Sequence, residues 1–339
     1  MIKANNRITW LDSSRGLAFL MVIYSHFTSF EETQMMRYFS PVFLTTFFFV
    51  SGYLTKSGCS FGKVFEQRTR TLFIPQLIFG LLLVLSTAVV TFKQHDEPLV
   101  SRLIGLVYPS AHHSNILWFI IALWAYSLVF YWLERFSKSY KTLLGVSTVL
   151  LIANWSVYKI ATPPDLPYFL GSLGYGCFYM SLGFAFRKIE QRVDKVVKGW
   201  MLICAFLVYM AVISLTGFSC SFYGSTHLID AVLLTVLGIF IMVYVSKLLP
   251  IGNNRFILFV GSNSLLYFCF HGKVLSFLDM LMQKFIYSHH IFEHSVMMDI
   301  AVRLSLTIVD ALIVIIPVLI VNRWMPFLTG KGYKLWNAK

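Results

Sequence analysis

The first apolar stretch of the chain, residues 10–26, reads WLDSSRGLAFLMVIYSH. Its composition is that of a membrane helix, yet it contains the acid Asp12, the base Arg15 and the imidazole of His26. Ionisable side chains within a bilayer are costly and mark functional positions by default. No small-residue cleavage pattern follows, so we expect the stretch to be retained as a first transmembrane helix and not removed as a signal peptide.

The spacing of these three residues places them on one side of a helix. Asp12 and Arg15 are three residues apart and can form an ion pair. Arg15 and His26 are eleven residues apart, close to three full turns, which separates them by about 16 Å along the axis. The same pattern would arise if Asp12 and Arg15 only anchored the helix at the membrane interface and His26 were a hydrogen-bonded polar residue near the outer edge. Gly16, which allows a second helix to approach closely, favours a functional site.

The whole chain has the composition of a membrane protein. Its 339 residues are 57% hydrophobic and only 13% charged, whereas a soluble domain has about 25% charged residues. The net charge of +13 is distributed between apolar segments, which excludes a nucleic-acid-binding domain and is typical of basic cytoplasmic loops. The five Cys residues form no CxxC motif, so we interpret them as small core residues.

Apolar segments between charged or turn-forming residues predict about ten transmembrane helices in one bundle. The expected spans are 12–30, 40–56, 72–92, 115–134, 142–160, 168–187, 200–217, 228–248, 257–277 and 299–321. If the N-terminus is cytoplasmic, three quarters of the 28 Lys and Arg residues fall in inner segments. This bias predicts that both termini are cytoplasmic. We therefore expect an all-α fold in which residues 1–339 form a single integral membrane domain.

Two further segments bear on function. Ser51-Gly52 ends an aromatic run and allows close helix packing, which by itself would explain the pair. Arg68 and Arg70 precede Pro75 on the predicted inner surface, where basic residues are common in any case. Arginine also binds phosphate groups bidentately, as a coenzyme A donor would require. Transfer to a hydroxyl needs a base as well, and neutral imidazole is suitable near pH 7.

Together these segments resemble the acyltransferase-3 family of membrane O-acyltransferases. That family opens with an L-D-x-x-R-G-x-A pattern followed by a His, which corresponds to residues 11–18 and His26. Its aromatic segment ending in Ser-Gly corresponds to residues 48–52. Its R-x-x-R run is matched only in part, because the second Arg is Arg70 and position 71 is Thr71. The Leu-Trp-Phe segment at 117–119 is similar to the fucose 4-O-acetylase-like branch.

The resemblance implies a membrane O-acyltransferase, and specifically an O-acetyltransferase active in polysaccharide modification. Cytoplasmic acyl-CoA would donate the acyl group, and a sugar hydroxyl of a cell-surface or lipid-linked glycan would accept it. Acetyl-CoA is then a co-substrate, and we expect no permanently bound cofactor. The implied partners are acyl-CoA, the glycan acceptor and membrane lipids, and the implied location is the inner cell membrane, crossed many times.

The resemblance also implies roles for particular residues. His26 would be the catalytic histidine, and Arg15, held in place by Asp12, would contact the acyl donor. Arg68 would contact the donor as well. We expect Arg70 and Ser51 to belong to the donor-binding residues, Arg70 from a position shifted relative to the family pattern.

Other interpretations remain open at the level of sequence. A transporter or flippase for a lipid-linked sugar is compatible with the spans, although such folds often have internal repeats and none is evident. A non-catalytic assembly or sensor protein explains the hydrophobicity but not the aligned residues. His271 suits either an acceptor cavity or a packed core, and Asp299, Arg303 and Asp310 share one face of the last span, as a structural ion cluster would.

Histidines in two outer loops invite a metal interpretation. They are His112, His113, His289, His290 and His294. No Cys or acidic residue accompanies them at the spacing of a zinc site. We therefore expect no metal centre.

Overall fold

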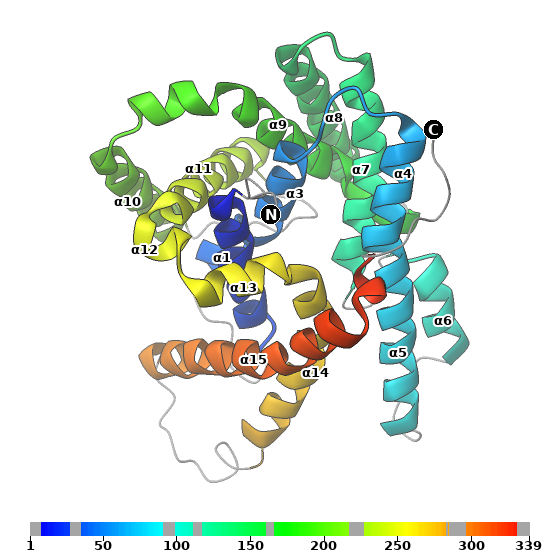
Figure 1. The fold of residues 1–339 in the computed structure, drawn as a ribbon. Coiled ribbons are helices and arrows are strands. Elements are labelled where there is room, and N and C mark those ends of the chain that lie inside the picture. Colours follow the sequence, from blue (N-terminus) through cyan, green and yellow to red (C-terminus); the bar gives the residue numbers. More distant parts are fainter. Residues whose placement is uncertain are drawn as a thin grey trace, which may run out of the picture. The chain divides into compact units, whose positions relative to one another are not determined.

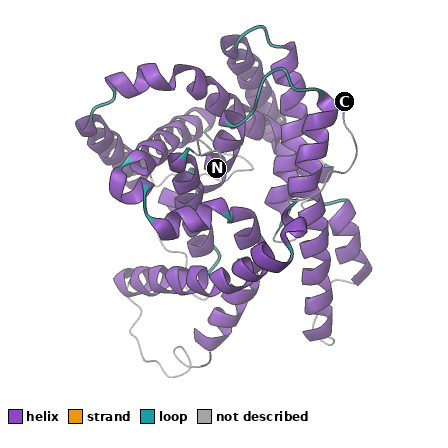
Figure 2. Ribbon diagram, in the orientation of Figure 1, coloured by secondary structure: helices purple, strands orange, loops and turns teal. Residues whose placement is uncertain are grey.

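The part of the chain that the computed structural model describes consists of helices and their connections (Figures 1 and 2). The described residues are 8–27, 35–90, 99–110, 117–160, 166–216, 227–282, 284 and 296–330. The α-helices are α1 (Thr9–Ser25), α2 (Met35–Phe39), α3 (Phe43–Tyr53), α4 (Phe61–Arg68), α5 (Ile74–Val90), α6 (Leu99–Val107), α7 (Trp118–Phe136), α8 (Tyr140–Ile160), α9 (Leu173–Val196), α10 (Gly199–Thr216), α11 (Leu228–Lys247), α12 (Leu249–Gly252), α13 (Arg255–Ser262), α14 (Ser264–Met282) and α15 (Val296–Trp324). A π-helical turn, η1 (Thr69–Phe73), joins α4 to α5, and two 3₁₀ turns are η2 (Pro167–Ser172) and η4 (Pro326–Thr329).

Within the described residues, six helices are long and apolar enough to cross a bilayer. They are Phe61–Ser86, Trp118–Phe136, Pro167–Val196, Leu228–Lys247, Ser264–Met282 and Val296–Trp324. A helix satisfies its backbone hydrogen bonds internally, which is why it can lie in hydrocarbon. Many of these helices expose large apolar side chains, such as Ile229 at 73% and Ile316 at 63%. The predicted class, a helical multi-pass membrane protein, is confirmed.

Each of the ten predicted spans contains helix, and four of them lie outside these six candidates. Helix α1 has 17 residues and α3 has 11, α8 is not among the six, and Gly199–Leu215 of α10 is apolar but shorter. The count of ten spans therefore stays a prediction. The terminal residues 1–7 and 331–339 lie outside the described residues, so their cytoplasmic location also stays a prediction.

The predicted span 257–277 is not one helix, and this expectation was wrong. Helix α13 ends at Ser262, Asn263 adopts φ −115° and ψ 17°, and α14 begins at Ser264. The Asn263 side-chain amide donates to the Phe259 carbonyl at 2.8 Å and to the Ser262 hydroxyl at 3.1 Å. Asn and Ser side chains offer the backbone such local alternatives to the helical ladder, which explains the break.

The helix around Arg68 also differs from the sequence expectation. A span was expected to begin at residue 72, but helical structure begins at Phe61 and continues through α4, η1 and α5. Arg68 is the last residue of α4, and Arg70 lies in the π-helical turn. Both arginines therefore lie in helical turns and not in a loop, and their location at the inner surface stays a prediction.

The chain forms two compact units. Unit 1 comprises Met1–Val50, Gln191–Tyr267 and Lys273–Val314, and unit 2 comprises Ser51–Glu190, Phe268–Gly272 and Ile315–Lys339. In unit 1, α1 packs against α11, α12 and most extensively α13 (Figure 1). In unit 2, α7 packs against α4, the π-helical turn and η2. The core of unit 1 therefore surrounds the first helix of the chain.

Candidate active site

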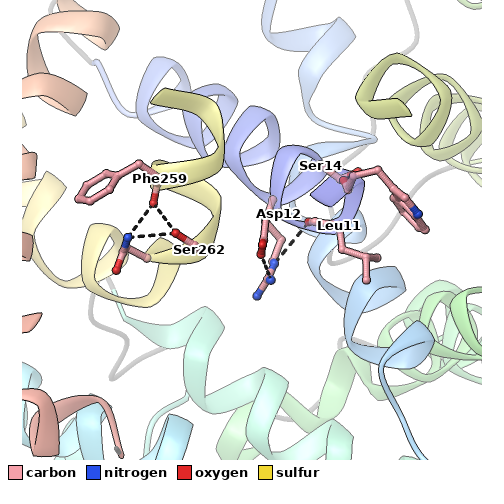
Figure 3. Close-up of polar contacts among 8 residues, drawn as sticks. Leu11, Asp12, Ser14, Phe259 and Ser262 are labelled. Carbon is pink, nitrogen blue, oxygen red and sulfur yellow. Dashed lines mark hydrogen bonds and ion pairs between the residues drawn. The ribbon is translucent and has the colours of Figure 1, made fainter. Parts of the chain in front are cut away.

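An ion pair lies at the N-terminal end of α1, where Figure 3 shows Asp12 beside Leu11. The Arg15 guanidinium donates from Nη2 to Asp12 Oδ1, and its Nε donates to the Leu11 carbonyl at 3.4 Å. The Asp12 side chain is 4% exposed and the Arg15 side chain 28%. The carboxylate is thus enclosed, while part of the guanidinium stays accessible to an anionic group such as a phosphate.

Helix α13 fixes the position of this ion pair by backbone contact. A Cβ on Gly261 would collide with the Asp12 carbonyl oxygen, and a Cβ on Gly16 would collide with the Ile257 carbonyl oxygen. Glycine at both positions lets the two helices touch, as small residues do between membrane helices. Phe259 and Ser262 of α13 are visible near this crossing in Figure 3. The ion pair is therefore built into a glycine-to-glycine helix crossing.

A serine next to the ion pair connects α1 to α12. The Ser13 hydroxyl is fully buried and lies 3.3 Å from the Gly252 carbonyl and 3.4 Å from the Ile251 carbonyl. The neighbouring Ser14 hydroxyl instead donates to the Trp10 carbonyl in its own helix at 2.8 Å. The N-terminal end of α1 is thus held on two sides, by α12 and by α13.

His26 forms the C-terminal cap of α1 and is half-buried. Its Nδ1 lies 2.7 Å from the Val22 carbonyl oxygen and 3.2 Å from the Ser25 hydroxyl. A carbonyl oxygen only accepts, so Nδ1 holds the proton in the neutral ring. Nε2 then holds the lone pair that a general base requires. This tautomer follows from the hydrogen-bond pattern at the end of the helix.

The side of α1 between Arg15 and His26 is apolar. Phe19 and Val22 lie on this side, at 0% and 1% exposure, and the Phe19 ring meets the Tyr267 ring edge to face at 5.6 Å. The predicted stripe is therefore polar at its two ends and packed between them.

In unit 2, Arg68 and Arg70 are half-buried around the π-helical turn. The Trp124 indole donates to the Thr69 hydroxyl at 3.1 Å. Gly330, at φ +74°, lies against the Arg70 carbonyl, where a Cβ would come within 2.5 Å. π-helical turns are rare and frequently occur at functional sites, and this one contains Arg70 and directly follows Arg68.

Ser51 lies near the C-terminal end of α3, where that helix crosses α9. Its hydroxyl is buried and makes no hydrogen bond within the described part of the chain. A Cβ on the adjacent Gly52 would collide with the Met180 backbone, so α3 and α9 are in backbone contact. The Arg187 guanidinium of α9 donates to the Tyr53 carbonyl at 3.2 Å, which satisfies the end of α3.

The predicted site residues divide between the two units. Asp12, Arg15 and His26 belong to unit 1, and Ser51, Arg68 and Arg70 belong to unit 2. Among them, Asp12 and Arg15 are in direct contact, and His26 lies at the opposite end of the same helix.

Gln76 is a candidate that the sequence interpretation missed. It is 0% exposed, and neither its amide oxygen nor its amide nitrogen makes a hydrogen bond to any described residue. It lies in the apolar helix that contains Arg68 and Arg70. A buried amide in a membrane helix is expensive unless it meets a polar partner. The signal was present in the sequence, as a single amide within the apolar run 72–92.

Two aromatic residues adopt a strained backbone. Tyr168 and Phe169 have φ values of 55° and 57°, in the left-handed region that bulky residues rarely adopt. The Phe169 carbonyl accepts a hydrogen bond from the Tyr126 hydroxyl, and the Phe169 ring packs on Trp118 at 5.0 Å. Strain of this kind occurs mainly at functional sites. No sequence pattern predicts it, because aromatic residues do not ordinarily mark left-handed turns.

The structure places His271 and two of the charged residues of the last span, Arg303 and Asp310, in buried positions. His271 is 0% exposed and packs edge to face on Phe268 at 6.2 Å. The Arg303 guanidinium lies over the Tyr24 ring at 5.7 Å. Asp310 is 0% exposed, and its carboxylate makes no hydrogen bond to the described residues. An ion pair between Arg303 and Asp310, as the shared face suggested, is therefore not formed.

The metal interpretation concerned histidines that lie outside the described residues, namely His112, His113, His289, His290 and His294. Among the residues that the structure does describe, no group of three or more His, Cys, Asp or Glu side chains could hold a metal ion.

The helices and this arrangement define an integral membrane protein with an ion pair and an imidazole at the two ends of one helix. A family model described as the acyltransferase domain, acyltransferase-3, matches residues 8–322 of the chain. The chain therefore belongs to the acyltransferase-3 family and is a membrane acyltransferase. Comparisons with curated proteins and with solved structures give no match.

Proposed function

We propose that this membrane acyltransferase is an O-acetyltransferase that moves the acetyl group of cytoplasmic acetyl-CoA to a sugar hydroxyl. The acceptor is a cell-surface or lipid-linked glycan, and the enzyme lies in the inner cell membrane. The sequence resemblance to the fucose 4-O-acetylase-like branch supports the choice of acetyl group and sugar. The observation that carries the proposal is the His26 ring, whose hydrogen bond to Val22 leaves Nε2 as the basic nitrogen.

His26 acts as the general base in this proposal. Nε2 removes the proton of the sugar hydroxyl as its oxygen attacks the thioester carbonyl. The carbon–sulfur bond of the thioester then breaks, the acetyl group stays on the sugar oxygen, and the coenzyme A sulfur takes the proton from the imidazolium. The Val22 carbonyl keeps the second ring nitrogen protonated throughout and supports the positive charge of the intermediate imidazolium.

Arg15 binds a phosphate of the acyl donor. Its guanidinium is the more exposed member of the ion pair, and Asp12 together with the Leu11 carbonyl orients it. The pantetheine arm of the donor is a long, flexible chain that leads from phosphate to thioester. It therefore suits a helix with its cation and its base about 16 Å apart along the axis at about 1.5 Å per residue.

Arg68, Arg70 and Ser51 are proposed to contact the donor as well. The sequence resemblance supports this role for Arg68, and the π-helical turn around Arg70 sets the two arginines apart from a regular helix. The buried Ser51 hydroxyl, which has no hydrogen-bond partner in the described residues, is suited to accept or donate one to a ligand.

The decisive experiment measures acetyl transfer in membranes that contain equal amounts of each variant. His26→Ala should reduce transfer by about 10²- to 10⁴-fold, the usual contribution of a positioned general base. Ser25→Ala is the matched control, because it removes one neighbour of the ring and leaves the Val22 contact. Release of free coenzyme A and incorporation of labelled acetyl into the glycan fraction are measured together.

Three results would contradict the proposal. Unchanged transfer by His26→Ala would remove the imidazole from the mechanism. An Arg15→Lys variant that lowers the maximal rate without raising the KM for acetyl-CoA would remove Arg15 from donor binding. Movement of a lipid-linked sugar across vesicles with no release of coenzyme A would favour a flippase.

A further inference from the structure

Unit 1 contains an apolar cavity of about 340 Å³ next to the helix that holds Arg15 and His26. Leu17 and Met21 of α1, Met210 of α10 and Met242 of α11 are among the residues that line it, and α2 completes the wall. Within this unit, α11 contacts α1 and α10, and α2 also contacts α1 and α10. The cavity is therefore a feature of helix packing inside unit 1.

The cavity lies on the side of α1 that faces away from the candidate active site. Leu17 follows Arg15 by two residues, a rotation of about 200°, and Met21 precedes His26 by five residues, about 140° away. A group attached to the reacting thioester would have to pass around α1 to enter. The cavity is thus separate from the path between Arg15 and His26.

The lining offers almost no polar group to a ligand. Tyr38 and Tyr209 contribute to it, but their hydroxyls are engaged elsewhere. The Tyr38 hydroxyl lies 2.6 Å from the Ser214 hydroxyl, and the Tyr209 hydroxyl donates to the Tyr38 carbonyl at 2.7 Å. Apolar cavities of this kind stay dry and bind apolar molecules. The lining therefore matches an apolar molecule better than water.

One wall of the cavity reaches an exposed apolar surface of α10. Phe206 of α10 lines the cavity and is 49% exposed. Its neighbours Ile203 and Leu207 on the same helix are 61% and 59% exposed. In a multi-pass membrane protein such side chains contact the hydrocarbon of the bilayer. An alkyl chain of the surrounding lipid is the apolar molecule present at this surface.

We propose that this cavity is a binding site for one acyl chain of a membrane phospholipid. Four methionines in the lining (Met21, Met35, Met210 and Met242) let it adapt to a flexible chain, because Met is unbranched and polarisable. The bound chain would contact α1 at Leu17 and Met21, whereas α13 packs against α1 at Asp12 and Gly16. This lipid site does not depend on the acyl-transfer reaction.

Photocrosslinking of the full chain tests the site directly. The protein is reconstituted in phosphatidylcholine vesicles that contain a trace of phosphatidylethanolamine with a diazirine in the middle of one acyl chain. After illumination, mass spectrometry locates the adducts. We expect adducts on the cavity methionines, above all Met21 and Met242, in addition to those on outward-facing side chains such as Leu233.

Filling the cavity should remove these adducts selectively. Ile241→Trp places a large side chain in the cavity from α11, and Met210→Trp does so from α10, so a folding failure of one variant leaves the other. Adducts on Met21 should fall about tenfold, equivalent to about 1.4 kcal/mol of binding free energy. Leu233→Trp, on α11 but 62% exposed and outside the lining, is the matched control and should leave them unchanged.

Two outcomes would overturn the proposal. Adducts on Met21 that persist in both filled variants, which still show normal adducts on Leu233, would mean that the probe does not enter the cavity. Adducts on Met21 that disappear when a small amount of an isoprenoid phosphate is added to the phosphatidylcholine vesicles, while those on Leu233 remain, would assign the cavity to an isoprenoid chain instead.

Discussion

The two sides of α1 differ in how closely other helices approach them. On one side, Gly16 and the facing Gly261 bring α1 and α13 into backbone contact, and the Asp12–Arg15 ion pair lies at that crossing. On the other side, Leu17 and Met21 border an apolar cavity of about 340 Å³. One helix thus combines a rigid contact that positions polar groups with a deformable wall.

This difference indicates on which side of α1 a substitution should destabilise the protein. Backbone atoms cannot rotate away from an added methyl group, whereas methionine side chains can. Because lipid is as apolar as leucine, membrane helices associate through close packing and interhelical hydrogen bonds and not through a hydrophobic force. Substitutions on the glycine side should therefore be costly, and those on the cavity side should not.

The largest expected effect is that of Gly261→Ala. The new Cβ would collide with the Asp12 carbonyl oxygen, so we expect a loss of about 3 kcal/mol in the free energy of unfolding, the upper end for overpacking. Titration with SDS in mixed micelles, followed by circular dichroism, measures it. Gly145→Ala is the control, because a Cβ there meets nothing within 4 Å, and it should stabilise by up to about 1 kcal/mol. Equal stability of both variants would contradict the importance of the crossing.

Asp12→Asn should have the next largest effect. Arg15 would lose its carboxylate partner but keep the Leu11 carbonyl, so we expect donor binding to weaken by about 1.5 kcal/mol, the lower end for hydrogen bonds to charged groups. This appears as roughly a tenfold rise in the KM for acetyl-CoA, since about 1.4 kcal/mol is tenfold.

Asp194→Asn is the matched control for Asp12→Asn. Asp194 pairs with Lys247 through a side chain that is 41% exposed, and exposed pairs contribute about 0–1 kcal/mol. The control should leave the KM unchanged. A rise in KM for both variants would indicate a general effect of charge and not a donor site at Arg15.

Ser13→Ala probes the contact between α1 and α12. It removes a buried hydroxyl that lies near the Gly252 carbonyl at 3.3 Å. Hydrogen bonds between membrane helices average about 0.6 kcal/mol, so a loss of this size is expected in the same SDS titration. A loss comparable to that of Gly261→Ala would show that α12, and not α13, dominates the positioning of the ion pair.

Met21→Ala should have the smallest effect. It enlarges a cavity that already exists and that an alkyl chain can fill. We expect the free energy of unfolding in phospholipid-containing micelles to change by no more than about 0.5 kcal/mol, as for substitutions at surfaces. A loss above that of Ser13→Ala would show that the cavity wall is as rigid as the glycine side.

Local sequence features predicted much of the helical structure and one element of the site. Apolar runs of about twenty residues predict membrane helices, because the backbone N–H and C=O groups in hydrocarbon must hydrogen-bond to one another. The three-residue spacing of Asp12 and Arg15 predicted their contact, because it brings side chains together on any α-helix. The break at Asn263 and the helix that begins at Phe61 were missed, since side-chain amides and a π-helical turn alter a helix without changing its hydropathy.

The sequence alone thus determined the class of protein, most of the helices, the ion pair on α1 and the family, because each depends on residues close together in the chain or on a pattern read along it. Only the tertiary structure decided that Gly261 meets Asp12, that Phe19 closes the side between Arg15 and His26, and that a cavity lies behind Leu17. The first two contacts join segments more than 200 residues apart, as does the contact of Ser13 with Gly252. They depend on which helices pack together, and hydropathy along the chain does not encode that choice.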